Sequence, residues 1–103
     1  MRPSLSVETA LKELGENLKT ARLRRRLPQN QVAERAGISL NTLSKIESGN
    51  PGVAIGNVAA AIQAIGLDVA LLSKIVSPVN DLGGISMEKE RLPRRARSPK
   101  QLF

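Results

Sequence analysis

A single glycine between two short amphipathic segments constrains this chain most. Gly37 lies within the stretch from Gln29 to Gly49, and a glycine there can adopt a positive φ at no steric cost, end one helix and turn the chain sharply. Small apolar residues form one face of the segment before it, and Leu43 and Ile46 form an i, i+3 stripe on the segment after it. The pattern predicts two helices joined by a tight turn, which is a helix-turn-helix.

The second helix of this pair carries the side chains best suited to contact a ligand. Ser39 is a good N-cap for this helix, and the loop from Gly49 to Gly52 ends it. Its outward side chains are hydrogen-bonding or small, and none is acidic: Leu40, Asn41, Thr42, Ser44 and Lys45. That composition argues against a module that only binds other proteins.

The composition also argues against an enzyme and against a metal site. The chain has 103 residues, which suits one small domain with tails, and it contains no cysteine and no histidine. Without histidine the chain lacks the usual general base and the commonest metal ligand, and without cysteine it has no thiolate to bind a metal. We expect no enzymatic activity, no metal and no cofactor. With no signal peptide and no run long enough to span a membrane, the chain is expected in a reducing cytoplasm.

Positive charge favours a polyanionic partner, most often a nucleic acid. The formal net charge is +7. It is split between the larger part of the chain and a short basic tail, because residues 86–103 hold six Lys and Arg against two Asp and Glu. Solubility alone is the simpler explanation of such a balance.

The chain is expected to divide into a flexible arm over residues 1–6, a helix-turn-helix DNA-binding and dimerisation domain over 7–76, and a basic, disordered tail over 77–103. A first helix starts at Val7, with a break considered at Gly15 because glycine weakens a helix interior by about 1 kcal/mol relative to alanine. The apolar residues of this helix follow helical spacing: Val7, Leu11, Leu14, Leu18 and Ala21.

A fourth helix and a short strand are predicted after the helix-turn-helix. Gly66 ends the helix, and its apolar face is formed by Ile55, Val58, Ala59, Ile62 and Ile65. Residues 67–76 are β-branched and apolar with incomplete alternation, which favours a strand over a fifth helix. An isolated strand needs a partner for its edges.

Spaced motifs along residues 27–49 resemble one known family. They are Leu27-Pro28-Gln29, Val32-Ala33, Ala36-Gly37-Ile38-Ser39, Thr42-Leu43-Ser44 and Ile46-Glu47-Ser48-Gly49. The set resembles the lambda-repressor-like (Xre/Cro) helix-turn-helix family and, within it, the HipB-type antitoxins of type II toxin–antitoxin systems. The resemblance covers roughly residues 14–72. It implies an all-α, lambda-repressor-like bundle of four to five helices, in which a short strand through Leu67, Val69 and Leu71 pairs with its twin across a homodimer.

The resemblance also implies which residues bind DNA. Gln29, at the N-terminus of the helix before the turn, would contact a DNA phosphate, where free backbone N–H groups and the helix dipole favour an anion. Asn50 would lie in the loop that follows the phosphate backbone. The remaining DNA-binding positions lie on the helix after the turn: Ser39, Leu40, Asn41, Thr42, Ser44 and Lys45.

The chemistry of these side chains suits base reading in the major groove. Asn41 can pair with adenine, Lys45 can donate to guanine or to a phosphate, and Leu40 can contact a thymine methyl group. Leu40 departs from the polar residue often found at this place in the family, so an apolar contact with a protein partner is its alternative role. The family's structural ion pair would join Arg22 to Glu47.

The resemblance implies a bacterial, nucleoid-associated antitoxin that binds double-stranded operator DNA, represses its own operon and neutralises a HipA-like kinase toxin. The alternative is a stand-alone Xre-type repressor of phage or restriction-modification type. A protein-interaction module that does not read DNA is a third hypothesis. The basic stretch from Arg91 to Arg97 is interpreted as a DNA-clamping tail, a segment that folds on a protein partner, or a solvated tail.

Overall fold

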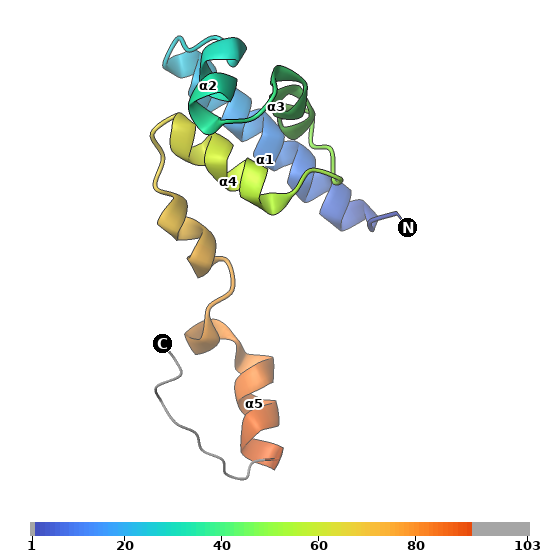
Figure 1. The fold of residues 1–103 in the computed structure, drawn as a ribbon. Coiled ribbons are helices and arrows are strands. Elements are labelled where there is room, and N and C mark those ends of the chain that lie inside the picture. Colours follow the sequence, from blue (N-terminus) through green and yellow to red (C-terminus); the bar gives the residue numbers. More distant parts are fainter. Residues whose placement is uncertain (1, 92–103) are drawn as a thin grey trace. The chain divides into compact units, whose positions relative to one another are not determined.

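The computed structural model describes residues 2–91, and within this range every regular element is a helix. The chain forms two compact units, Met1–Val69 and Ala70–Phe103. The first unit contains four α-helices (Figure 1), which are α1 (Leu5–Arg24), α2 (Gln29–Ala36), α3 (Leu40–Glu47) and α4 (Ile55–Ala64). After α4 the chain forms two short 3₁₀ helices and one α-helix, which are η1 (Val69–Lys74), η2 (Pro78–Asn80) and α5 (Leu82–Arg91).

The hydrophobic core of the first unit holds the two helices of the turn together. α2 packs against α3 and α4, and α1 packs against α3. Leu43 of α3 and Val32 of α2 are the largest side chains that are fully buried, and burial of each contributes about 1.5–3 kcal/mol. The rest of the core comes from Leu18, Ala33, Ile46, Ala61 and Ile65.

The turn between α2 and α3 has the geometry that the sequence predicts. Gly37 adopts φ 72° and ψ 28°, in the left-handed region. The N–H group of Ile38 donates to the carbonyl oxygen of Ala33 at 3.0 Å, which satisfies a carbonyl at the end of α2. Ser39 then caps α3, because its hydroxyl accepts the N–H group of Thr42 at 3.0 Å.

α1 is longer than the sequence predicts. It is one continuous helix of 20 residues, and the break considered at Gly15 does not occur. Ser4 caps its first turn by accepting the N–H group of Val7 at 3.3 Å, so the helix already begins at Leu5, inside the segment expected to be a flexible arm. A serine followed by helix-forming residues is a start signal, and the apolar spacing alone placed the start too late.

α1 buries only part of the face that the apolar spacing indicates, since Leu18 is buried and Ala21 packs against the core. The buried positions are Gly15, Leu18 and Arg22, whereas Val7 and Leu14 are exposed. The first turns of α1 extend beyond the other helices of this unit (Figure 1). Val7, in the first turn of α1, is therefore exposed although it follows the apolar spacing.

The face of α4 differs from the prediction at its first residue. Ala61 and Ile65 are buried, and Val58 and Ile62 are packed against the core. Ile55, predicted on the same face, is 74% exposed because it begins the helix, at the edge of the packed region.

The strand predicted over residues 67–76 does not form in this structure. Val69–Lys74 is a 3₁₀ helix, in which Leu71 is exposed and Val69 is half-buried. The hydroxyl of Ser73 donates to the carbonyl oxygen of Ala70 at 2.8 Å. A strand needs a neighbouring strand to pair its backbone groups, and a short 3₁₀ segment instead uses partners three residues away in the same chain.

Part of the segment predicted to be a disordered tail is helical. α5 spans Leu82–Arg91, and its first turn is capped by Asp81, whose carboxylate accepts the N–H group of Gly84 at 3.0 Å. The sequence signal for this helix was Asp81 followed by good helix formers at residues 87–91. The high charge and the prolines of the tail had indicated disorder instead. The basic stretch after Arg91 lies outside the described residues.

None of the helices in residues 2–91 is both long and apolar enough to cross a membrane. In the same range no three carboxylate, imidazole or thiol side chains lie together as a metal site would require.

Candidate nucleic-acid interface

The outward face of α3 is accessible at four of the positions predicted to bind DNA. Leu40, Asn41, Ser44 and Lys45 are all exposed, and Leu40 is 49% exposed despite its apolar side chain. The opposite face is buried through Leu43 and Ile46 and anchors the helix in the core. α3 therefore presents an amide, a hydroxyl, an ammonium and an alkyl group to a ligand, and these groups match the donor, acceptor and methyl pattern of a major groove.

Ser39 and Thr42 belong to the start of α3 more than to its outward face. The hydroxyl of Ser39 accepts the N–H group of Thr42 at 3.0 Å and donates to the hydroxyl oxygen of Thr42 at 2.9 Å. Thr42 is half-buried. The two side chains are thus committed to capping, and their predicted DNA contacts would compete with this local hydrogen bonding.

Gly49 follows the end of α3 and packs against the backbone of α1. Gly49 adopts φ 82°, and its N–H group donates to the carbonyl oxygen of Ile46 at 3.0 Å. A Cβ atom built on Gly49 would lie 2.7 Å from Cα of Lys12 in α1. Both the left-handed backbone and the close approach require glycine here.

A second close approach joins α1 to the end of α3. Gly15 is buried, and a Cβ atom built on it would lie 2.5 Å from the carbonyl oxygen of Ile46 and 2.6 Å from that of Glu47. The sequence prediction treated Gly15 as a weak point of the helix and missed this role. The available signal was a glycine inside a strongly periodic helical pattern, which often has a packing reason.

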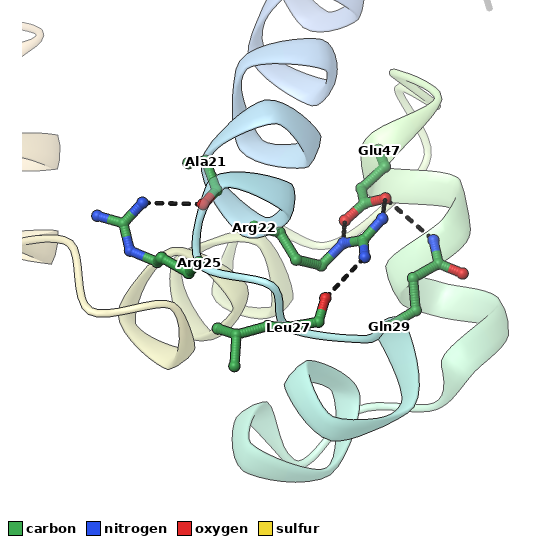
Figure 2. A network of polar contacts seen from close by, with 6 residues as sticks. All are labelled: Ala21, Arg22, Arg25, Leu27, Gln29 and Glu47. Atoms are coloured by element: carbon green, nitrogen blue, oxygen red, sulfur yellow. Dashed lines mark hydrogen bonds and ion pairs between the residues drawn. The ribbon is translucent and has the colours of Figure 1, made fainter.

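Arg22 and Glu47, predicted to pair, are brought together by α1 and α3 (Figure 2). The guanidinium donates through Nε to Oε2 at 2.7 Å and through Nη2 to Oε1 at 3.0 Å, so the pair is bidentate. The Arg22 and Glu47 side chains are only 7% and 4% exposed, respectively. Nη1 of Arg22 also donates to the carbonyl oxygen of Leu27 at 2.9 Å, and this contact fixes the loop before α2.

Gln29 joins this buried network from the first residue of α2. Its amide nitrogen Nε2 donates to Oε1 of Glu47 at 3.0 Å, and its side chain is half-buried. Pro28, the N-cap of α2, provides no side-chain hydrogen bond to the helix. The first backbone N–H groups of α2 are therefore available to an anion, beside an amide that the sequence prediction assigned only to DNA.

Asn50 closes the loop after α3 and lines a polar hollow. Its side-chain oxygen accepts the N–H group of Gly52 at 2.7 Å. The hollow has a volume of about 180 Å³ and lies between α3 and the start of α4, lined by Thr42, Lys45, Asn50, Gly52, Val53, Ala54 and Asn57. Lys45 and Asn50 thus share one concave surface with the sequence-distant Asn57, which the sequence prediction did not select.

The three residues predicted for dimer pairing lie elsewhere. Leu67, Val69 and Leu71 follow α4, and only Val69 is half-buried while the other two are exposed. Near Arg22, a second arginine binds the end of α1. The guanidinium of Arg25 donates to the carbonyl oxygen of Ala21 at 2.9 Å (Figure 2), so this arginine caps the last turn of α1.

A family model described as a helix-turn-helix domain matches residues 13–75. No curated protein and no solved structure matches the chain. The matched range contains α2, the turn at Gly37 and α3, together with most of α1 and all of α4. More than half of the sequence is covered, and the chain therefore belongs to the helix-turn-helix domain family, whose fold is typical of DNA-binding regulators.

Proposed function

We propose that this protein is a sequence-specific transcriptional repressor that binds double-stranded operator DNA through α3. One observation carries the proposal. The only acidic residue of α3, Glu47, is buried and paired with Arg22, so the exposed face of the helix presents no carboxylate to a phosphate-rich ligand. A helix face without an exposed acidic side chain, in a chain whose formal net charge is +7, suits a polyanionic ligand.

The proposed mechanism separates affinity from specificity. α3 enters the major groove, where Asn41 and Lys45 read base edges and Leu40 contacts a thymine methyl group. Gln29 and the first N–H groups of α2 bind a phosphate on the flanking backbone. Phosphate contacts supply affinity that falls with salt, and the α3 side chains discriminate between sequences.

A homodimer on a palindromic operator is part of the proposal. Two copies of α3 would occupy successive major grooves about 34 Å apart. Exposed apolar side chains after α4 support a self-association surface, since Leu71, Ile75 and Val76 are 63%, 74% and 75% exposed. Sedimentation of the free chain and of its complex with DNA measures the stoichiometry, and a one-to-one complex with an intact palindrome would contradict the dimer.

A narrower role as a HipB-type antitoxin rests on the overall resemblance, which covers roughly residues 14–72, and on the basic C-terminal tail. The strand that this role also implies does not form in the structure. In that role the protein would also neutralise a HipA-like kinase toxin and repress its own operon, without enzymatic activity of its own. Affinity purification from the native host, with both DNA and co-purifying proteins sequenced, separates the roles. A kinase-like protein in near-equal amount supports the antitoxin, and a DNA site without a stoichiometric protein supports a stand-alone Xre-type repressor.

Selection from randomised DNA tests the DNA-binding function itself. The wild-type chain should enrich one palindromic site. Lys45→Ala should relax the preference at one position of each half-site, by about 1–3 kcal/mol if Lys45 contacts a base. Lys19→Ala, an exposed position on α1, is the matched control that removes the same charge and should leave the enriched sequence unchanged. Recovery of no enriched site with the wild-type chain would contradict the proposed function.

A further inference from the structure

The carboxylate of Glu47 is shared between two elements of the helix-turn-helix. Its oxygens accept hydrogen bonds from Nε of Arg22 at 2.7 Å, from Nη2 of Arg22 at 3.0 Å and from Nε2 of Gln29 at 3.0 Å. Glu47 is the last residue of α3, and Gln29 is the first residue of α2. One buried side chain therefore links the end of the recognition helix to the predicted phosphate site.

The hydrogen bond to Glu47 restricts how Gln29 can present its amide. A glutamine amide has two N–H donors and one acceptor oxygen. One N–H group is held by the ionised acceptor, and such charge-assisted bonds are stronger than neutral ones. Figure 2 shows the amide oxygen pointing away from Glu47. The second N–H group takes no part in the bond to Glu47, and Pro28, the N-cap of α2, supplies no capping side chain.

Arg22 makes this arrangement compatible with a phosphate nearby. An unpaired carboxylate behind an anion site would repel the ligand, but the bidentate guanidinium neutralises Glu47. The Glu47 side chain is 4% exposed, so it does not itself reach a ligand. Gln29, which is half-buried and contacts Oε1 of Glu47, offers a route by which Glu47 can influence binding.

We propose that Glu47 is a positioning residue for DNA binding, which holds the Gln29 amide in place to donate its second N–H group to a backbone phosphate. The inference rests on the proposed function, because it names how one contact of that function is set up. The orientation of the amide is thereby built into the free protein, and binding loses less side-chain entropy than it would with a mobile glutamine.

A comparison of two neutral replacements of the ion pair tests the role of the acceptor. Arg22→Met/Glu47→Met removes the acceptor without leaving a buried charge, a change that folded proteins often tolerate. Arg22→Met/Glu47→Gln removes the same charges but keeps a side-chain oxygen that can accept from Gln29. DNA affinity is measured for both by titration of the selected operator, at a temperature where circular dichroism shows each variant folded.

The expected result is a difference between these variants that depends on Gln29. The Glu47→Met version should bind the operator about three- to ten-fold more weakly than the Glu47→Gln version, the range of one net hydrogen bond. In a Gln29→Ala background the two should bind equally. The loss should be the same for all DNA sequences and should leave the salt dependence unchanged, because a neutral amide releases no counterion of its own.

Two results overturn the inference. Equal affinity of the two variants in the presence of Gln29, or a difference that persists after Gln29→Ala, would show that Glu47 does not act through this amide. If either variant fails to fold, Gln29→Met in the wild-type background replaces them, and it should lower affinity about three- to ten-fold. Because Gln29→Met also removes a charge-assisted hydrogen bond to Glu47, affinity is measured well below the melting temperature of this variant. Unchanged affinity then overturns the inference, whereas failure of the wild-type chain to bind any DNA contradicts the proposed function as well.

Discussion

Gly15 of α1 and Ile46 of α3 meet backbone to backbone. A Cβ atom on Gly15 would lie 2.5 Å from the carbonyl oxygen of Ile46, a distance that real side chains do not adopt. The last turn of α3 therefore lies directly against the main chain of α1. A side chain at position 15 would force α1 and the end of α3 apart.

Gly15→Ala should destabilise the protein by up to about 2 kcal/mol, since overpacking costs about 1–3 kcal/mol and the better helix propensity of alanine offsets about 1 kcal/mol of that. Chemical denaturation measures the change. Gly56→Ala is the matched control, because Gly56 lies in α4 with no atom within 4 Å of the added Cβ, and it should be neutral or stabilising. Equal effects of the two substitutions would contradict the close approach.

Gly49→Ala should cost more than Gly37→Ala, although both glycines have a positive φ. At Gly37 nothing lies within 4 Å of an added Cβ, so only backbone strain of about 1–2 kcal/mol is expected. At Gly49 an added Cβ would also overlap with the backbone of Lys12 at 2.7 Å, and this overpacking raises the expected loss to about 2–5 kcal/mol. The free energy of unfolding is measured for both variants and for the wild-type chain. A larger loss for Gly37→Ala than for Gly49→Ala would refute the prediction.

Glu47→Ala should be strongly destabilising, by about 3–5 kcal/mol, because it leaves the guanidinium of Arg22 buried without its partner. Glu34→Ala removes the same charge from an exposed position on α2 and should change stability by no more than about 0.5 kcal/mol. Thermal unfolding of both variants measures the difference. A small effect of Glu47→Ala would mean that water reaches Arg22 in the folded protein.

Ser39→Ala and Ser44→Ala should separate the capping of α3 from its contact with DNA. Ser39 caps the helix through Thr42, and its loss should cost about 1 kcal/mol of stability with little change in base preference. Ser44 is exposed, so its replacement should hardly alter stability but should change the bases selected from a random pool. A change in base preference with Ser39→Ala alone would reverse these assignments.

The local features of the helix-turn-helix could be predicted from the sequence because each depends on residues within one helical turn. The positive φ of Gly37, the cap formed by Ser39 and the buried pair of Val32 and Leu43 follow from propensity and spacing. The capped start of α5 at Asp81 has the same local origin, and it was missed because the composition of the tail outweighed the cap.

Features that depend on backbone positions far apart in the chain required the tertiary structure. No local pattern indicates that Gly15 faces the carbonyl oxygens at the end of α3 or that Gly49 faces Lys12. A glycine inside a helical pattern can indicate a close packing contact, but it does not indicate which distant residues make that contact. Gln29 was assigned to DNA alone, and its bond to Glu47 depends on how α2 and α3 are packed. For residues 69–74, β-branched composition favoured a strand, but a strand also needs a partner, and in the single chain these residues form a 3₁₀ helix instead.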